Sequence, residues 1–368
     1  MIPVAEPLIM ERDRELVNEA MTSGWISSAG RFLDLFEERW ANYCDMPYGI
    51  AVSNGSTALD IAVCLLGLKT GDEVIMPTFT IISPAQSIVR GGGIPVLVDS
   101  DPITWQMDTR QIERKITPRT KAILVVHIYG HPADMDDIMS LAKRYGLTVI
   151  EDAAEVHGAE YRGRKCGGFG DISTFSFYAN KLVTTGEGGM VLVPDPELAE
   201  RARSLRNLSF RKERRFLHEE MGYNFRLTNI QAALGVSQLE RIEMIIKKKR
   251  SIAHFYQKRL HNLKGLQLPA EKSWAKNVFW VYGLVLDDSV PFDAIEFAAR
   301  LAQRGVETRP FFLGMHEQPV FTKIGLFDGE TYPVAERLAR RGLYIPSGLT
   351  LTEDQMDSVV SAITEALS

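Results

Sequence analysis

Short apolar segments bounded by turn residues alternate with segments of helical periodicity along the first half of the chain. The apolar segments with the length of strands are 49–52, 73–76, 95–98, 122–127, 147–150, 173–178 and 190–193. Helical periodicity runs through 57–66, 83–90 and 135–145, between members of that series. Short apolar strands separated by helices are typical of a sheet whose two faces are both covered. The pattern therefore predicts an α/β fold.

The second half of the chain has a different pattern. Residues 229–260 have the periodicity of one or two long helices, and 278–286, 293–303 and 353–367 suggest a smaller α+β unit. At 368 residues the chain is long enough for one large domain and a smaller one. We therefore predict a large domain over 1–245 and a small C-terminal domain over 246–368. The basic run from Lys247 to Arg250 is interpreted as a solvated helix face.

The composition excludes several functional classes. Lys and Arg number 42 against 47 Asp and Glu, a formal net charge of −5, which gives no electrostatic footprint for nucleic acid or an anionic membrane. The three cysteines lack the spacing of metal ligands, so no metal is predicted. The N-terminus has no basic leader or long apolar run, and no later segment is long enough to cross a bilayer. We expect a cytoplasmic protein in a reducing setting.

One lysine stands apart from all other charged residues in its region. Lys181 is the only charged residue between Asp171 and Glu187, at the point where a strand-like alternation gives way to a glycine loop. Apolar and neutral surroundings disfavour the ammonium form, so the pKa of this lysine is expected to fall and a nucleophilic amine to become available. Such an amine is what an aldehyde cofactor requires. The alternative is a surface lysine on a hairpin.

Two further strand ends carry polar side chains. Asp152 comes just after the segment 147–150 and could hold a pyridine nitrogen in its protonated form; it could equally cap the following turn. The sequence 53–57, Ser-Asn-Gly-Ser-Thr, leads into an apolar helix and has the features of an anion site, or of an N-capping box without a ligand. Ser176 offers another hydroxyl. Ligands gather at the carboxyl ends of strands in α/β sheets, so these groups are predicted to meet.

Six motifs in order carry a resemblance to a known family. They are Asn-Gly-Ser-Thr-Ala-Leu at 54–59, Gly-Asp-Glu-Val-Ile-Met-Pro-Thr-Phe-Thr at 71–80, Glu-Asp-Ala-Ala-Glu at 151–155, Ser-Phe-Tyr-Ala-Asn-Lys at 176–181, Gly-Glu-Gly-Gly-Met at 186–190 and Gly-Tyr-Asn-Phe-Arg-Leu-Thr-Asn-Ile-Gln-Ala-Ala at 222–233. Together they resemble the sugar-nucleotide aminotransferases of the DegT/StrS type, a branch of the fold type I pyridoxal phosphate enzymes. The resemblance implies a large domain with a mostly parallel, mixed sheet and a smaller C-terminal α+β domain.

The resemblance also implies roles for individual residues. Lys181 is expected to bind the cofactor's aldehyde and act as general base, Asp152 to pair with the pyridine nitrogen, and Glu155 to lie near the phenolic oxygen. The phosphate is expected to be held by the start of the helix and one strand end, through Gly55, Ser56, Thr57 and Ser176. Asn224 is expected to reach the cofactor of a neighbouring subunit, which implies a homodimer with shared active sites. Where the family places an aromatic residue on the cofactor ring, this chain has Ile81, so either Ile81 or Phe79 is expected to supply the apolar contact.

Three other segments narrow the resemblance. Residues 25–32, 279–282 and 308–319 are similar to those of GDP-perosamine synthases. This implies that L-glutamate donates an amino group to C4 of GDP-4-keto-6-deoxymannose, in the assembly of a surface polysaccharide such as O-antigen. The expected contacts to the sugar nucleotide are Ser27, Arg309, His316 and the Arg211 to Arg215 stretch. As alternatives, Arg309 pairs with an acid and His316 is a satisfied buried histidine.

Other functions remain open at this point. A UDP- or dTDP-linked keto sugar is an alternative substrate. A dehydratase on the same scaffold is disfavoured because such relatives replace the lysine with histidine. A non-catalytic regulatory protein is disfavoured because both Lys181 and Asp152 are present.

Overall fold

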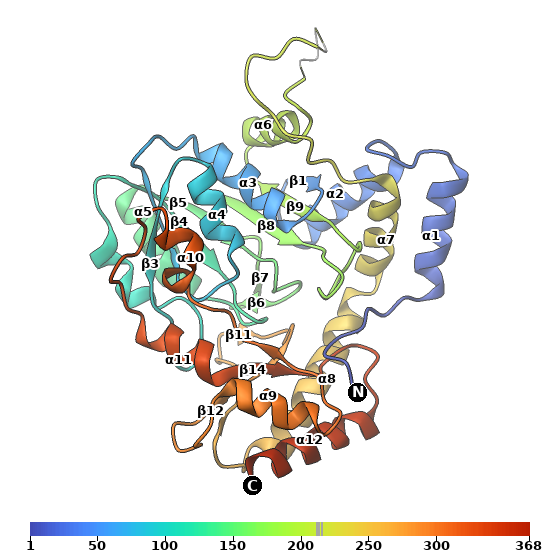
Figure 1. Cartoon of the computed structure of the whole chain (residues 1–368). Helices are drawn as coiled ribbons and strands as arrows, with labels where there is room; N and C mark the ends of the chain where they lie inside the picture. Colours follow the sequence, from blue (N-terminus) through green and yellow to red (C-terminus); the bar gives the residue numbers. More distant parts are fainter. Residues whose placement is uncertain (211–213, 215) are drawn as a thin grey trace.

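The computed structural model describes residues 1–210, 214 and 216–368 (Figure 1). A large sheet with its covering helices forms the upper part of the molecule in that view, and a smaller sheet with helices packed around it forms the lower part. The long helix α8 (Ile242–Leu260) runs from one part into the other. The boundary expected between residues 245 and 246 falls inside this helix, and it stays a prediction.

The large sheet confirms the expected α/β fold. Among the described residues it has seven strands in the spatial order β1 (Tyr48–Val52), β9 (Gly189–Val193), β8 (Ile172–Ser176), β5 (Thr148–Asp152), β4 (Thr120–Val126), β2 (Glu73–Pro77) and β3 (Ile94–Val98). β8, β5, β4, β2 and β3 are parallel to one another, whereas β9 is antiparallel to both β1 and β8. The sheet is therefore mixed and mostly parallel.

Alternation along the strands buries both faces of this sheet. In β4, Leu124 and Val126 belong to a core shared with α3 (Gly55–Leu66) and α4 (Ser83–Arg90). Ile123 and Val125, which alternate with Leu124 and Val126 along the strand, belong to a second core shared with α5 (Met135–Tyr145). Successive side chains of a strand point to opposite faces, so a strand covered on both sides is apolar throughout. This explains why the strand segments are continuous apolar runs in the sequence.

Further helices and short strands complete the upper part of the molecule. The helices are α1 (Glu11–Thr22), α2 (Arg31–Tyr43), α6 (Pro196–Arg206) and α7 (Asn229–Glu240), with 3-10 turns at Thr109–Gln111 and Glu113–Lys115. A three-stranded antiparallel sheet joins β11 (Ala275–Lys276), β6 (Glu160–Tyr161) and β7 (Arg164–Lys165).

The lower part has its own sheet and core. Its antiparallel strands lie in the order β10 (Leu266–Gln267), β12 (Tyr282–Leu286), β14 (Gly342–Ile345) and β13 (Arg309–Pro310). The helices are α9 (Ala294–Ala302), α11 (Pro333–Arg341) and α12 (Glu353–Leu367), and the 3-10 turn Met315–Glu317 and α10 (Pro319–Thr322) precede α11. Tyr256, Phe297 and Ile363 lie in a core of their own. The N-terminus joins this part, because Ile2 pairs with Val306.

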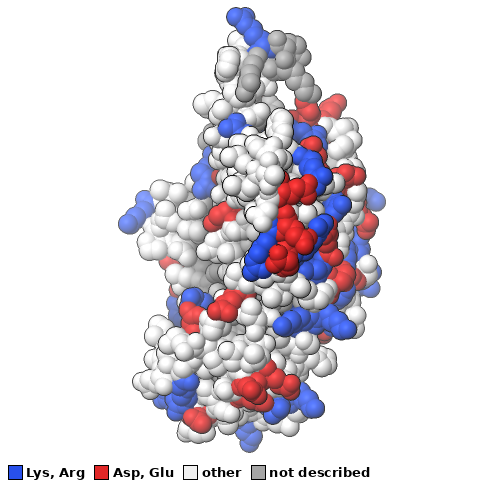
Figure 2. Space-filling view, turned by 90° about the vertical axis from the view of Figure 1, so that its right-hand side faces the viewer, with Lys and Arg blue, Asp and Glu red and all other residues white. Residues whose placement is uncertain are grey.

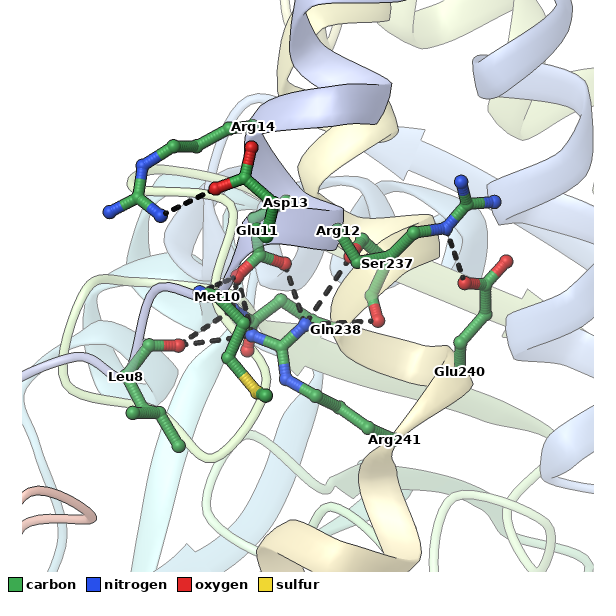
Figure 3. A network of polar contacts seen from close by, with 10 residues as sticks. All are labelled: Leu8, Met10, Glu11, Arg12, Asp13, Arg14, Ser237, Gln238, Glu240 and Arg241. Carbon is green, nitrogen blue, oxygen red and sulfur yellow. Dashed lines mark hydrogen bonds and ion pairs between the residues drawn. The ribbon is translucent and has the colours of Figure 1, made fainter.

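A buried ion pair fixes α1 against α7 (Figure 3). The Asp13 side chain is 2% exposed, and its Oδ1 accepts a hydrogen bond from Nη1 of Arg241 at 2.7 Å. Arg241 also donates to the carbonyl of Leu8 at 3.0 Å. The pKa of Asp13 is lowered even though burial opposes this, because Arg241 donates hydrogen bonds to the carboxylate. The segment before α1 is thereby held in place.

The surface has no single sign of charge on the face that lies to the right in Figure 1. Figure 2 shows acidic and basic side chains intermixed there. In the part of the chain that the structure describes, no helix combines the length and the apolarity needed to span a membrane.

Candidate active site

Strand β5 ends with two carboxylates that face opposite sides of the sheet. The strand extends through Asp152, two residues beyond the predicted end. Glu151 is fully buried and accepts hydrogen bonds from five donors: His127 Nε2, the backbone N–H groups of Gly167, Phe169 and Gly170, and Ser173 Oγ. With its lone pairs occupied in this way, Glu151 has a structural role. Asp152, on the other face, lines a cavity.

This cavity brings together most of the residues predicted for the cofactor. It has a volume of about 490 Å³ and lies at the carboxyl ends of β1, β5 and β8. Seven predicted residues line it: Gly55, Ser56, Ile81, Asp152, Glu155, Ser176 and Lys181. Its volume is within the range of small-molecule sites, about 300–1,000 Å³. The prediction that strand ends would gather these groups at one edge of the sheet is confirmed.

Lys181 lies on the connection between β8 and β9. Its side chain is 10% exposed, and Nζ lies 3.7 Å from Oε1 of Glu155 and 3.6 Å from the ring centroid of Trp280. Burial lowers the pKa of Lys181, while the charges of Glu155 and Asp152 oppose that change. The direction agrees with the expectation from sequence, and the surface-lysine alternative does not hold.

The two carboxylates of the cavity shift in the opposite direction. Burial raises the pKa of Asp152 to about 6, against the hydrogen bond from the Ala154 N–H and the charge of Lys181. Burial raises the pKa of Glu155 to about 7, although Lys181 lies close by. Burial thus lowers the pKa of the amine and raises the pKa values of the two acids, which brings them closer together than in water. Groups with pKa values close to the working pH are suited to moving protons.

A strained turn positions Glu155 and Trp280. Tyr129 has a φ of 58°, in the left-handed region, and its N–H donates to Oε2 of Glu155 at 2.7 Å. The next residue, Gly130, has a φ of 107°, and a Cβ there would lie 2.6 Å from the backbone nitrogen of Trp280. Only glycine allows this approach. The indole N–H of Trp280 donates to the carbonyl of Asn180 at 2.8 Å, which holds the ring beside Lys181.

The start of α3 provides an anion cradle on one side of the cavity. Asn54 caps the helix by accepting a hydrogen bond from the Thr57 N–H at 2.9 Å. The first N–H groups of a helix have no acceptor within it and attract anions. A Cβ at Gly55 would lie 2.6 Å from Cβ of Ser176, so glycine lets the helix start approach the end of β8. Ser56 and Ser176 line the cavity beside it.

These features match the needs of pyridoxal phosphate. Lys181 offers the amine, Asp152 a carboxylate for the ring nitrogen, and the α3 start with Ser56 a site for the phosphate. Because Gly55 has no Cβ, the start of α3 and the Ser176 side chain lie close together at one side of the cavity. The residues present therefore fit the cofactor.

Three residues predicted for the cofactor lie outside the cavity lining. Thr57 is buried and forms a capping box with Asn54, which agrees with the alternative interpretation of 53–57 as an N-capping box. Phe79 is fully buried and packs against Tyr129, with ring centroids 5.9 Å apart. Ile81 is 46% exposed and lines the cavity, so it is the better placed of the two apolar candidates. Asn224 is exposed and pairs with Asn207; its role toward a neighbouring subunit stays a prediction.

The residues predicted for the sugar nucleotide do not line this cavity either. Ser27 is exposed, and its carbonyl accepts the N–H of Asn229 at 2.6 Å. Arg309 pairs with Glu307 at 2.6 Å and lines a neighbouring cavity. The Arg211 to Arg215 stretch, apart from Arg214, lies outside the described residues.

The surroundings of His316 agree with the alternative that it is a satisfied buried histidine. The ring is buried, with Nδ1 2.9 Å from Oγ1 of Thr78 and Nε2 3.2 Å from Oε1 of Glu336. Both ring nitrogens therefore have partners within the chain, which leaves neither available for a sugar oxygen.

Several residues of the cavity had no assigned role in the sequence. Tyr178, Asn180, Ser83, Trp280 and Tyr344 all line it. Tyr178 and Asn180 flank Lys181 within the motif at 176–181, and Trp280 lies in the segment 279–282. Proximity to the reactive lysine was a usable signal for Tyr178 and Asn180. For Trp280 and Tyr344, the signal lies only in the packing of the lower part against the large sheet.

Comparisons with known proteins agree with this geometry. The model of the DegT/DnrJ/EryC1/StrS aminotransferase family matches residues 7–364. GDP-perosamine synthases from Escherichia coli O157:H7 and Caulobacter vibrioides are each 41% identical over 367 residues, covering 100% of this chain and 99% and 98% of those proteins. The crystal structure of the aminotransferase TlmJ from Streptoalloteichus hindustanus is 31% identical with a TM-score of 0.93, covering 100% and 99% of the two chains. DesV from S. venezuelae is 35% identical with a TM-score of 0.90, covering 96% and 93%.

Proposed function

Since the chain belongs to the DegT/DnrJ/EryC1/StrS aminotransferase family, whose members are sugar aminotransferases that depend on pyridoxal phosphate, we propose that it forms GDP-perosamine. In this reaction the amino group of L-glutamate replaces the C4 keto oxygen of GDP-4-keto-6-deoxymannose. The observation that carries the aminotransferase function is the single cavity shared by Lys181, Asp152 and the start of α3. The choice of sugar is supported by the names of the relatives with 41% identity.

The proposed roles follow from the surroundings of each side chain. Bound pyridoxal phosphate supplies an electron sink that stabilises negative charge at the substrate carbon. Asp152 holds a proton at the ring nitrogen, and Ser56, Ser176 and the α3 N–H groups hold the phosphate. Lys181 takes the proton from the α-carbon of glutamate as general base and delivers a proton to C4 of the sugar in the second half of the reaction. Its lowered pKa favours the neutral amine that this task needs.

Glu155 lies close enough to Lys181 for its charge to affect the pKa of the amine. Its carboxylate lies 3.7 Å from Nζ of Lys181 and is fixed by the Tyr129 N–H. Because burial raises its pKa to about 7, Glu155 can accept a proton when the amine gives one up. The residue therefore acts as a nearby proton store in the proposed reaction.

A homodimer with shared active sites is part of the proposal. Met21, Trp25, Ile26 and Met221 are exposed apolar side chains, from 48% to 93% accessible, of the kind that an interface covers. In the proposed dimer, Asn224 reaches the cofactor phosphate in the neighbouring subunit. Mixing an inactive Lys181→Ala variant with an inactive Asn224→Ala variant should then restore activity, since a hybrid contains one intact site. Activity that stays absent in the mixture contradicts shared sites.

The absorption spectrum of the holoenzyme tests the proposed reaction. L-Glutamate should bleach the absorbance of the bound cofactor, and GDP-4-keto-6-deoxymannose should restore it in a second step. UDP- and dTDP-linked 4-keto sugars serve as the comparison, and recovery with one of them alone refutes the GDP sugar. A protein that does not change colour with any amino donor is a regulatory protein on this fold. The proposed product belongs to surface polysaccharide assembly such as O-antigen, and the proposed setting is cytoplasmic.

A further inference from the structure

A second cavity lies on the other side of the reactive lysine. It has a volume of about 300 Å³ and shares a wall with the first cavity, made of Tyr178, Asn180, Lys181, Trp280 and Tyr344. The N-terminal segment 4–8 and the segment 347–349 line it as well. A molecule in this space therefore has access to the amine of Lys181.

Lys249 of α8 lines the second cavity and is not part of the shared wall. It is 6% exposed, so the interpretation of the 247–250 run as a solvated face is wrong at this residue. The reason is periodicity: Lys249 follows Ile246 by three residues and precedes Ile252 by three, which places it on the buried stripe of the helix. Lys247, two residues earlier, is exposed.

The ammonium of Lys249 has hydrogen-bond acceptors, but none of the described side chains serves as its counter-ion. Nζ donates to the carbonyl of Ser347 at 2.6 Å and lies 3.2 Å from its Oγ. Among the described residues, no carboxylate lies within ion-pair distance of this Nζ. Burial lowers the pKa of Lys249 to about 7, with no opposing charge. A buried cation without a counter-ion is costly unless an anion joins it.

The other charges of the second cavity are already balanced or bonded. Glu307 pairs with Arg309 at 2.6 Å and accepts the Val4 N–H at 2.9 Å. Glu6 accepts a hydrogen bond from Thr350 Oγ1 at 3.0 Å. Lys181 faces Glu155 across the shared wall. Glu6 is exposed to solvent, so Lys249 is the buried charge of this cavity that has no ion-pair partner among the described residues.

We propose that Lys249 binds the distal carboxylate of the amino donor, with the donor's amino group at Lys181. This inference rests on the proposed function, because it needs an amino acid substrate. The α-carboxylate is attached to the carbon that bears the amine and stays close to Lys181, whereas the distal carboxylate reaches further into the cavity. The volume suits an amino acid better than a nucleoside diphosphate. Lys249 thus makes the site selective for a dicarboxylic donor.

The test compares two amino donors in the holoenzyme. Bleaching of the bound cofactor is measured with L-glutamate and with L-alanine, in the wild type, Lys249→Met and the matched control Lys247→Met. Loss of a charge-assisted contact should reduce the efficiency with glutamate by about tenfold or more in Lys249→Met and leave alanine unchanged. The control should behave like the wild type. An equal loss with both donors, or no loss with either, overturns the inference.

A binding measurement distinguishes a carboxylate ligand at Lys249 from a phosphate ligand. Calorimetry with glutarate, a dicarboxylate without an amine, should show weaker binding to Lys249→Met, while GDP binding stays the same. Weaker GDP binding with unchanged glutarate binding assigns the cavity to a phosphate and overturns the inference. Lys249→Gln, which keeps a donor for Ser347, gives the same readout if Lys249→Met does not fold. If the wild type bleaches with no amino acid, the proposed function itself fails.

Discussion

Replacing Asp152 with asparagine should stabilise the protein without cofactor at alkaline pH. Burial raises the pKa of Asp152 from 3.8 to about 6, a change of about two units at 1.36 kcal/mol each, or about 3 kcal/mol. The folded state holds the proton more tightly than the unfolded chain, so wild-type stability falls as the pH rises from about 4 through about 6 and stays lower above that. Asparagine has the same shape, and its oxygen can still accept the Ala154 N–H.

Urea unfolding of the cofactor-free proteins at equal protein concentration measures this effect. The free energy of unfolding of Asp152→Asn should exceed that of the wild type by up to about 3 kcal/mol at pH 8, and the difference should vanish near pH 4. Asp328→Asn, at an exposed position, serves as control and should change stability by less than about 0.5 kcal/mol. With pyridoxal phosphate bound, the advantage should shrink or reverse, because the carboxylate then faces a positive ring nitrogen. Equal or lower stability of Asp152→Asn at pH 8 would falsify the reasoning.

Three other substitutions test separate parts of the structure. Gly55→Ala places a Cβ 2.6 Å from Cβ of Ser176 and should weaken cofactor affinity by roughly tenfold, measured by spectroscopic titration; unchanged affinity contradicts the cradle. Asp13→Asn leaves a buried guanidinium unpaired and should reduce the free energy of unfolding by about 3 kcal/mol at pH 7. Because the pKa of Asp13 is lowered, this difference should decrease as the pH falls below about 4, and a constant difference refutes the ion pair as its cause. Trp280→Leu removes the ring face that stabilises the ammonium of Lys181 and should lower the pKa of this lysine by about one unit. The pH dependence of cofactor uptake measures that pKa, and a rise in it contradicts the expectation.

The large sheet was predictable because its strands are buried on both faces. β4, for example, is buried and apolar at every position from Ala122 to Val126, and such a run is a clear signal in the sequence. The strand ends then led to Lys181, Asp152, Ser56 and Ser176, since all parallel strands deliver their carboxyl ends to one edge. The predicted end of β5 was two residues short because Glu151 and Asp152 are polar, although both are buried.

Other parts of the site left no local signal. Trp280 and Tyr344 reach the cavity from the lower part of the molecule, and no sequence motif or spacing predicts that they line it. The prediction for Lys249 was wrong because the composition of a basic run was given more weight than its helical period. The sequence alone could not decide whether His316 contacts the sugar nucleotide or is a satisfied buried histidine. The structure decides this, because Thr78 and Glu336, from other segments of the chain, lie within hydrogen-bond distance of its two ring nitrogens.

The reversed direction of β9 determines what kind of loop carries Lys181. A connection between parallel neighbours has to travel to the opposite edge, usually through a helix. Here Ser176 and Gly189 are paired, so the loop 177–188 leaves and rejoins the sheet at adjacent points on the same edge. Its base is further closed by hydrogen bonds between Phe177 and both Gly188 and Thr185. A closed loop of this kind tolerates little change in length, so new substrate preferences in such a scaffold should arise from insertions in the surrounding segments while the loop itself keeps its size.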